Sequence, residues 1–296
     1  MSIPAGTHIP LDDDALLALA IDLTERAGAA ILAVRARGFE VIRKSDASPV
    51  TEADHAAEAI ILAGLRAAAP DIPVIAEEEM AAGHPGVASD AFWLVDPLDG
   101  TREFTAGRDE FTVNIALIRK SRPVLGVVGV PVTGEIFLGI VGRGAAKRDS
   151  TGRHAILARK PPPEGLTVLA SRSHANEAGL QAFLRGRNVA KISNYGSSLK
   201  FCRMAEGLAD LYPRQGRTME WDTAAAQAVL EAAGGAVLTM DGSPLRYGKP
   251  GWENPHFYAT GQIVAVAPLP GETGGTKGPE PTRYGDWAHK GRVSDF

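Results

Sequence analysis

The chain has 296 residues, 45% hydrophobic and 22% charged, which is typical of folded globular proteins and excludes disorder over most of its length. A formal net charge of −4, from 31 basic and 35 acidic residues, excludes an overall positive field that would attract nucleic acid or an anionic membrane. At about 100 to 200 residues per domain, this length favours one large or two smaller domains.

The sequence shows no signal for export or membrane insertion. The single cysteine, Cys202, can form no internal disulfide, and its apolar surroundings predict a buried free thiol. No apolar run approaches the roughly 18 residues of a membrane helix, and residues 1–14 lack the basic and apolar regions of a signal peptide. We therefore expect a cytoplasmic protein.

The first half of the chain predicts two helices beside an antiparallel sheet. Residues 12–37 open with aspartates, which suit a helix N-terminus, and carry apolar residues at helical spacing. A polar loop over 44–53 leads to a second helix over 54–69, which Pro70 ends. Short apolar or alternating runs predict the strands, at 72–76, 92–95, 110–118, 123–131 and 135–141.

The second half predicts strands and helices in alternation, as in an α/β unit. Residues 142–163 are rich in Gly, Arg and Pro, so we place a solvated linker there and a domain boundary near 150. Beyond it we predict strands at 167–170, 189–192, 209–212 and 236–239, with helices starting at 177, 198 and 222. The predicted units are 1–150, 151–268 and a flexible tail, 269–296, which is dominated by Gly, Pro, Thr and charge.

The most informative segment is residues 92–104, FWLVDPLDGTREF. A buried strand delivers Asp96 to its polar end, and the proline that follows forces a turn, which brings Asp99 round to the same side. Two carboxylates this close favour a cation between them, and oxygen ligands suit a hard ion such as Mg²⁺. Gly100–Thr101 begin a helical turn whose free N–H groups suit a phosphate. The alternative is an ordinary Asp/Pro/Gly surface turn.

Other carboxylates occur at predicted strand ends and helix starts. The run Glu77–Glu79 follows the strand at 72–76, where a solvated loop end is the usual explanation. Asp222 and Asp54 each head a predicted helix, where an N-cap is the default role. None of them alone indicates a metal site.

Together, these residues resemble the signature of the lithium-sensitive, Mg²⁺-dependent phosphatase superfamily of inositol monophosphatases. The signature is an acidic strand end, a DPxDGT turn and a later WD at a helix start, matched here by 76–78, 96–101 and 221–222. The resemblance spans 16–261 and implies a layered αβαβα sandwich that combines α+β and α/β halves. Residues 196–214, GSSLKFCRMAEGLADLYPR, and 171–174, SRSH, look like the 3′(2′),5′-bisphosphate nucleotidase branch, the CysQ type.

The resemblance implies a metal-binding role for five residues, four in the first half of the chain and one in the later WD motif. Glu77, Asp96 and the backbone carbonyl of Leu98 would hold one Mg²⁺. Asp96, Asp99 and Asp222 would hold a second. Glu77 is also a candidate ligand of a third, looser ion, and inhibition by Li⁺ is implied as well.

The resemblance also implies a catalytic role for Asp54 and Thr101, which would orient and deprotonate the attacking water, with Glu77 as a third catalytic residue. This role replaces the N-cap interpretation of Asp54. The implied reaction is an in-line displacement at phosphorus.

The second half is implied to complete the site and to bind the nucleoside. The implied substrate contacts are Glu77, Leu98, Asp99, Gly100, Thr101, Ser171, His174, Gly196, Ser197, Lys200 and Asp222. Arg172 and Lys200 are candidate partners of the substrate's charge, with solvation at the surface as their alternative role. The seven histidines show no zinc-binding spacing.

The implied activity is hydrolysis of the 3′-phosphate of adenosine 3′,5′-bisphosphate to AMP and phosphate, in sulfur assimilation and nucleotide recycling. The sulfated analogue, 3′-phosphoadenylyl sulfate, is a second candidate substrate. The alternative is an inositol monophosphatase or a sugar phosphatase like fructose-1,6-bisphosphatase.

The C-terminal residues 274–296 have a resemblance of their own. RYGDW followed by KGRVSDF is similar to the end of the small succinate dehydrogenase assembly factors, which act on the flavoprotein subunit. This implies a contact with succinate dehydrogenase and a place at the periphery of the inner membrane. The alternative is a gene-fusion remnant without function.

Overall fold

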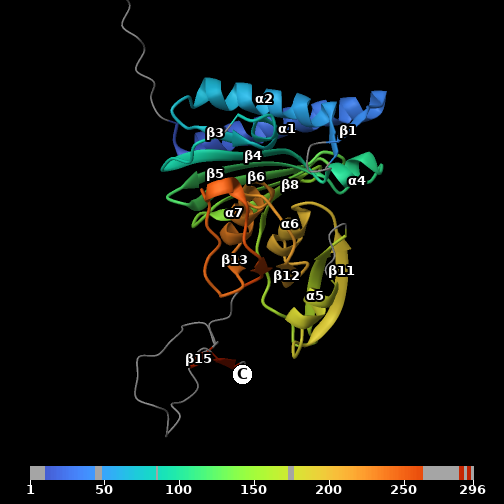
Figure 1. Cartoon of the computed structure of the whole chain (residues 1–296), viewed down its shortest axis with the longest axis vertical. Coiled ribbons are helices and arrows are strands. Elements are labelled where there is room, and N and C mark those ends of the chain that lie inside the picture. Colours follow the sequence, from blue (N-terminus) through green and yellow to red (C-terminus); the bar gives the residue numbers. More distant parts are fainter. Residues whose placement is uncertain are drawn as a thin grey trace, which may run out of the picture.

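Helices and sheets alternate in layers in the computed structural model, which describes residues 11–43, 49–84, 86–172, 177–262, 287–289 and 292–294. Two long helices, α1 (Asp13–Arg37) and α2 (Glu52–Ala68), cover one face of a seven-stranded sheet (Figure 1). The other face carries α6 (Leu199–Ala205) and α7 (Ala224–Ala232), followed by a five-stranded sheet and α5 (Glu177–Phe183). The predicted αβαβα sandwich is confirmed.

The seven-stranded sheet follows the order of the chain. Its strands are β3 (Val74–Ala76), β4 (Ala91–Asp99), β5 (Thr112–Arg119), β6 (Arg122–Val130), β7 (Glu135–Ile140), β8 (Gly144–Asp149) and β9 (Gly152–Ile156). Neighbouring strands are antiparallel except β3, which is parallel to β4. The linker predicted over 142–163 is therefore wrong in its first part, because β8 and β9 form a hairpin there.

The two faces of this sheet bury different side chains, as expected for alternation along a strand. Trp93 and Val95 of β4 pack with α1 and α2, whereas Phe92 and Leu94 join the core that includes α6 and α7. At β6 the approach of α7 is so close that a Cβ on Gly126 would lie 2.2 Å from a backbone oxygen of that helix. Only glycine fits there.

The five-stranded sheet supplies the other side of the central core. Its spatial order is β11 (Val189–Tyr195), β10 (Leu166–Ser171), β12 (Leu211–Arg214), β14 (Phe257–Thr260) and β13 (Ala236–Thr239). β10 is parallel to both of its neighbours, and the other two pairs are antiparallel. β14 is an addition to the predicted strands, and the division of the chain into units at 150 and 268 stays a prediction.

Short elements complete the described chain. The predicted loop over 44–53 is shorter than expected, because β2 (Pro49–Thr51) pairs with β1 (Val41–Arg43) and leads directly into α2. The remaining pieces are α3 (Glu77–Ala81), α4 (Thr101–Thr105), the 3-10 turns η1 (Glu220–Asp222) and η2 (Pro250–Trp252), and the paired strands β15 (Trp287–His289) and β16 (Arg292–Ser294). The rest of the predicted tail lies outside the described residues. No helix in the described ranges is long and apolar enough to cross a bilayer.

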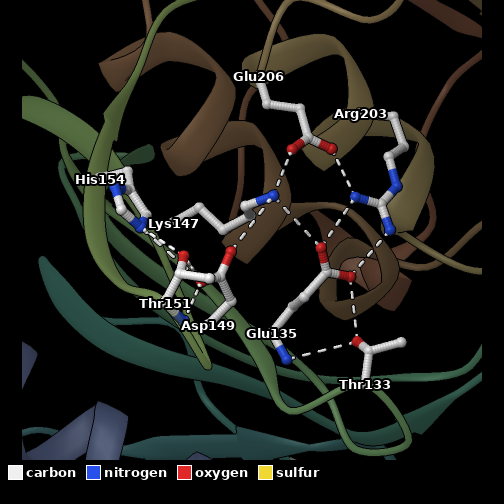
Figure 2. Close-up of polar contacts among 8 residues, drawn as sticks. All are labelled: Thr133, Glu135, Lys147, Asp149, Thr151, His154, Arg203 and Glu206. Carbon is white, nitrogen blue, oxygen red and sulfur yellow. Dashed lines mark hydrogen bonds and ion pairs between the residues drawn. The ribbon is translucent and has the colours of Figure 1, made fainter.

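An ion network ties α6 to the seven-stranded sheet (Figure 2). Arg203 on α6 donates to both carboxylate oxygens of Glu135, at 3.2 and 2.9 Å, and Lys147 of β8 donates to Glu206 at 3.0 Å. All four side chains are at most 22% exposed. Because α6 begins beside the DPLDG turn, this network holds the far end of a helix whose first residues reach the candidate site.

Candidate active site

Parallel pairing of β3 and β4 places two acidic residues side by side. Ala76 of β3 lies opposite Val95 of β4 in the register. The residues that follow them, Glu77 and Asp96, therefore lie at the same edge of the sheet. Ala76 and Val95 point into the core under α1 and α2, and the alternation along a strand turns the following residues to the opposite face. The glutamate run is not a solvated loop end, since Glu77 starts α3 and Glu78 is only 4% exposed.

The DPLDG segment turns at the end of β4, as predicted. The N–H of Leu98 donates to Oδ1 of Asp96 at 3.0 Å, a local bond typical of aspartate in turns. Gly100 follows with φ of 94°, in the left-handed region, and a Cβ there would lie 3.0 Å from the carbonyl oxygen of Glu110. The chain then enters α4 at Thr101.

Asp54 contacts both its own helix and the turn. The N-cap of α2 is Thr51, and Oδ2 of the buried Asp54 accepts hydrogen bonds from the N–H and the hydroxyl of Thr51, each at 2.8 Å. Oδ1 lies 3.2 Å from the hydroxyl of Thr101, which is also 3.1 Å from the carbonyl oxygen of Leu98. One carboxylate oxygen thus serves the capping box, and the other is paired with a hydroxyl.

Asp99 and Asp222 lie within electrostatic range of each other and of Glu77. Burial raises the pKa of Asp99 to about 6, the Lys200 ammonium and the Ser198 N–H oppose this, and acidic neighbours including Glu77 add to it. Burial and the charges of Asp99 and Glu77 raise the pKa of Asp222 well above its usual range. The predicted N-cap role of Asp222 is wrong, because Thr223 holds that position in α7.

The donor set of this cluster fits Mg²⁺. Carboxylates that raise one another's pKa are relieved by a cation, and a set of oxygen ligands suits a hard one. As the side chains stand, no group of three or more His, Cys, Asp or Glu residues in the described part of the chain is arranged to hold a metal ion. Backbone N–H groups engage the carboxylates instead, that of Ser198 for Asp99 and that of Met219 for Asp222. The predicted ligand set stays a prediction.

Lys200 belongs to the interior of the site. It is 4% exposed, so its alternative role in solvating the surface is wrong. Its ammonium donates to the carbonyl oxygens of Tyr195, at 3.2 Å, and Ser197, and it lies 5.1 Å from the centre of the Tyr212 ring. Burial lowers the pKa of Lys200 to about 8, and the charge of Asp99 opposes the shift.

Glu110 joins the two loops that were predicted to meet the nucleoside. Its Oε1 is 2.7 Å from the guanidinium of Arg172, which follows Ser171 at the end of β10, and its Oε2 accepts the N–H of Gly196 at 2.8 Å. Arg172 therefore has an acidic partner within the protein. His174, the fourth residue of the SRSH segment, lies outside the described residues.

The structure adds two buried charged residues that sequence analysis missed. Arg214 is 7% exposed, and its Nε has no hydrogen-bond partner among the described residues. Its charge adds to the lowering of the Lys200 pKa and opposes the rise of the Asp222 pKa. Glu58 accepts the N–H groups of Glu78 and Glu79, and burial raises its pKa to about 7. Two sequence signals could have pointed to them. Arg214 is the last residue of the strand β12, and Glu58 lies one helical turn after Asp54 on α2.

Comparison with known proteins finds two family matches, which overlap at residues 262–272. Residues 12–272 match the inositol monophosphatase family, and residues 262–296 match a family described as protein of unknown function (DUF1674). That second match assigns no role, so the expected contact of 274–296 with succinate dehydrogenase stays a prediction.

Similar proteins align with most of the segment that matches the inositol monophosphatase family, residues 12–272. A relative from Shigella flexneri named 3′(2′),5′-bisphosphate nucleotidase CysQ is 46% identical over 227 residues, 76% of this chain and 91% of the relative. The Salmonella typhimurium protein of the same name is 45% identical over 80% of this chain and 96% of its own length. The crystal structure of CysQ from Bacteroides thetaiotaomicron superposes with a TM-score of 0.71 at 36% identity, covering 84% of this chain and 98% of that one.

Proposed function

Because this chain belongs to the inositol monophosphatase family, we propose that it removes the 3′-phosphate of adenosine 3′,5′-bisphosphate as a Mg²⁺-dependent nucleotidase. Relatives that are 45% to 46% identical and carry the nucleotidase name support this substrate class. The observation that carries the proposal is the Thr101 to Asp54 hydrogen bond, located beside the interacting carboxylates Glu77, Asp99 and Asp222.

We infer that the metal ligands are Glu77, Asp96, the carbonyl of Leu98, Asp99 and Asp222. The family is metal-dependent, and the finer proposal is two ions that share Asp96, with Glu77 also near a third. When bound, Mg²⁺ lowers the pKa of water and neutralises charge on the phosphoryl group and the leaving oxygen.

The side chains of Thr101 and Asp54 supply a path for the proton of the attacking water. The Thr101 hydroxyl can pass its own proton to Oδ1 of Asp54 while it accepts one from the water. Thr51 fixes Oδ2, which keeps Oδ1 directed at the hydroxyl. As the water oxygen bonds to phosphorus, the bond to the ribose 3′-oxygen breaks, and that oxygen takes up a proton to give AMP and phosphate.

The second phosphate of the substrate accounts for the buried cations. An acidic site repels a doubly phosphorylated substrate unless positive charge faces the second phosphate. Lys200 and Arg214 are both less than 10% exposed and both act electrostatically on the carboxylates of the site. We infer that they face the 5′-phosphate, a group that inositol 1-phosphate lacks. The sulfated analogue keeps the same 3′-phosphate and is a second candidate substrate.

A paired assay tests the substrate. Purified protein with Mg²⁺ is given adenosine 3′,5′-bisphosphate, inositol 1-phosphate and fructose 1,6-bisphosphate, and phosphate release is measured for each. We expect the highest kcat/KM for the nucleotide. Preferential turnover of the inositol or sugar ester would replace this proposal by the alternative activity. Inhibition by Li⁺ is expected for each activity and does not discriminate between them.

A second proposal, of another class, rests on the sequence resemblance of residues 274–296. Residues 274–296 lie beyond the inositol monophosphatase match, which ends at 272, and within the second family match, over 262–296. We propose that 274–296 binds the flavoprotein subunit of succinate dehydrogenase, which would bring a cytoplasmic enzyme to the periphery of the inner membrane. A pull-down with that subunit compares the full chain with one ending at Pro268, and equal capture of both would contradict the proposal.

A further inference from the structure

We propose that Glu220, Lys249 and Asn254 form a clamp that positions Asp222 for metal binding. This Asp222 clamp rests on the proposed function, in which Asp222 is a metal ligand. The three residues are not among the predicted site residues. Glu220 belongs to the short turn η1 that carries Asp222, Lys249 contacts Glu220, and Asn254 contacts Met219, which precedes the turn.

Glu220 fixes one side of this segment. It is 0% exposed, and its carboxylate accepts the N–H groups of Gly248, at 2.6 Å, and Lys249, at 2.9 Å. The ammonium of Lys249 adds an ion pair at 2.6 Å. Three donors from one loop thus hold a carboxylate that lies two residues before Asp222.

Asn254 fixes the other side. Its amide nitrogen donates to the carbonyl oxygen of Met219 at 2.8 Å and to the hydroxyl of Thr223 at 3.1 Å, and its amide oxygen accepts from Lys249 at 3.2 Å. Its backbone N–H donates to the carbonyl oxygen of Thr218 at 2.9 Å. Lys249 therefore links both sides of the clamp.

The clamp acts on Asp222 through Met219. The N–H of Met219 donates to Oδ2 of Asp222 at 2.9 Å, and the carbonyl oxygen of the same residue is held by Asn254. The turn η1 has only three residues and α7 starts without a side-chain cap, so the local contact that fixes the Asp222 carboxylate is the Met219 N–H, whose peptide the clamp in turn holds.

Mg²⁺ affinity, measured by calorimetry on the full chain without substrate, tests the clamp independently of turnover. Asn254→Leu removes the amide at unchanged net charge. Lys249→Met removes a positive charge, which by electrostatics alone would strengthen cation binding, whereas loss of positioning weakens it. We expect both variants to bind Mg²⁺ roughly tenfold more weakly, the lower end of the range for partners of metal ligands.

Glu253→Gln is the matched control. Glu253 is adjacent to Asn254 and pairs with Arg217 at 3.3 Å, but both side chains are more than half exposed. We expect an Mg²⁺ affinity within twofold of wild type for this variant. Thermal unfolding in EDTA shows whether each variant is folded. Asn254→Leu and Lys249→Met remove different contacts of the clamp, so if one variant misfolds, the other still tests the proposal.

Failure of the clamp and failure of the proposed function give different results. Wild-type Mg²⁺ affinity in the folded clamp variants, with weak binding in Asp222→Asn, would overturn the clamp and keep the metal site. Wild-type affinity in Asp222→Asn itself would overturn the ligand assignment and the clamp with it.

Discussion

The hydroxyl of Thr101 lies 3.2 Å from Oδ1 of Asp54, although the two residues are 47 positions apart in the chain. Asp54 occupies the third position of a long helix, and Thr101 begins a short one after the DPLDG turn. This contact brings the α2 helix and the edge of the seven-stranded sheet together at the point where we infer the proton leaves the attacking water.

Thr101→Val tests that pair, because valine keeps the shape and removes the hydroxyl. We expect kcat to fall roughly 10²- to 10⁴-fold, the usual contribution of a positioned proton acceptor. Mg²⁺ affinity, measured by calorimetry, stays near the wild-type value. Thr105→Val is the control, since Thr105 lies on the same helix, is partly exposed, and donates its hydroxyl to the carbonyl oxygen of Arg102. A kcat within threefold of wild type in Thr101→Val would contradict the proton path.

Asp99→Asn is expected to abolish turnover and leave the fold intact. Burial raises the pKa of Asp99 to about 6, so ionisation of this carboxyl costs the folded state free energy, and a neutral amide removes no stabilising charge. Activity and Mg²⁺ binding are measured together with near-UV circular dichroism. Asp109→Asn serves as the control, because Asp109 pairs with Arg35 at the surface. Retained turnover in Asp99→Asn would remove Asp99 from the metal ligands.

Glu110→Gln is expected to raise KM for the nucleotide more than KM for a small phosphate ester. The new amide places an NH₂ group against Arg172 or the Gly196 N–H, both of which are donors, and the loops separate. A donor left unsatisfied costs about 1 to 3 kcal/mol, so we expect KM for adenosine 3′,5′-bisphosphate to rise roughly tenfold. KM for 4-nitrophenyl phosphate, measured alongside, is the internal control. An equal rise for both substrates would show that these loops do not select the nucleoside.

Arg203→Met breaks the ion network of Figure 2. Glu135 is 14% exposed and Glu206 is 9% exposed. Without Arg203, Glu135 keeps Lys147 and the Thr133 hydroxyl as partners, and Glu206 keeps Lys147. Breaking a fully buried pair costs about 3 to 5 kcal/mol, and because this one is partly open to solvent we expect about 2 kcal/mol from urea denaturation at pH 7. Arg217→Met, which breaks an exposed pair, is expected to cost under about 1 kcal/mol.

The cost of Arg203→Met is also expected to depend on pH. Burial pushes the pKa of Glu135 up, but Arg203, Thr133 and Lys147 bring it below the ordinary 4.5. The folded wild type thus binds fewer protons than the unfolded chain, and the stabilisation present above pH 4.5 is lost as the pH falls through the folded pKa. The difference between variant and wild type therefore shrinks below pH 4.5. A difference that stays constant would show that Arg203 stabilises through packing alone.

Cys202 is expected to be inert in the folded protein. Its side chain is fully buried, and burial raises the pKa of the thiol. A thiol-specific chromogenic reagent at pH 8.5 then labels the only cysteine of the chain no faster than the protein unfolds, and labels it at once in denaturant. Full labelling of the native protein at the rate of an exposed thiol would contradict the packing of α6.

The sequence pattern predicted those helices, strands and turns whose conformation depends on residues close together in the sequence. The spacing of apolar residues identified α1, α2 and most strands, and the DPLDG turn follows from Asp96 and Gly100 themselves. The β8–β9 hairpin escaped prediction because its glycines and basic residues suit a linker equally well. Lys147 is acceptable in that sheet because it pairs with Glu135 on the neighbouring strand β7 and with Glu206, which is 59 positions away on the chain.

The burial of charged side chains marks where sequence reasoning stops. The sequence leaves solvation at the surface open as a role for Lys200. In the structure its ammonium is buried and contacts two carbonyl oxygens and an aromatic ring. Asn254 carries no motif, and its importance comes from contacts with residues 31 to 36 positions away. Only the folded chain shows such partners, because neither composition nor periodicity records them.

The parallel pairing of β3 with β4 makes the spacing of two key carboxylates independent of the loop between the strands. Glu77 and Asp96 are neighbours because the ladder holds β3 and β4 about 4.8 Å apart, and the described connecting residues 82–84 and 86–90 lie outside that ladder. Insertions there lengthen a surface loop at a small entropic cost. This connection is therefore a place where new sequence, and with it new surface properties, can accumulate during evolution without disturbing the chemistry.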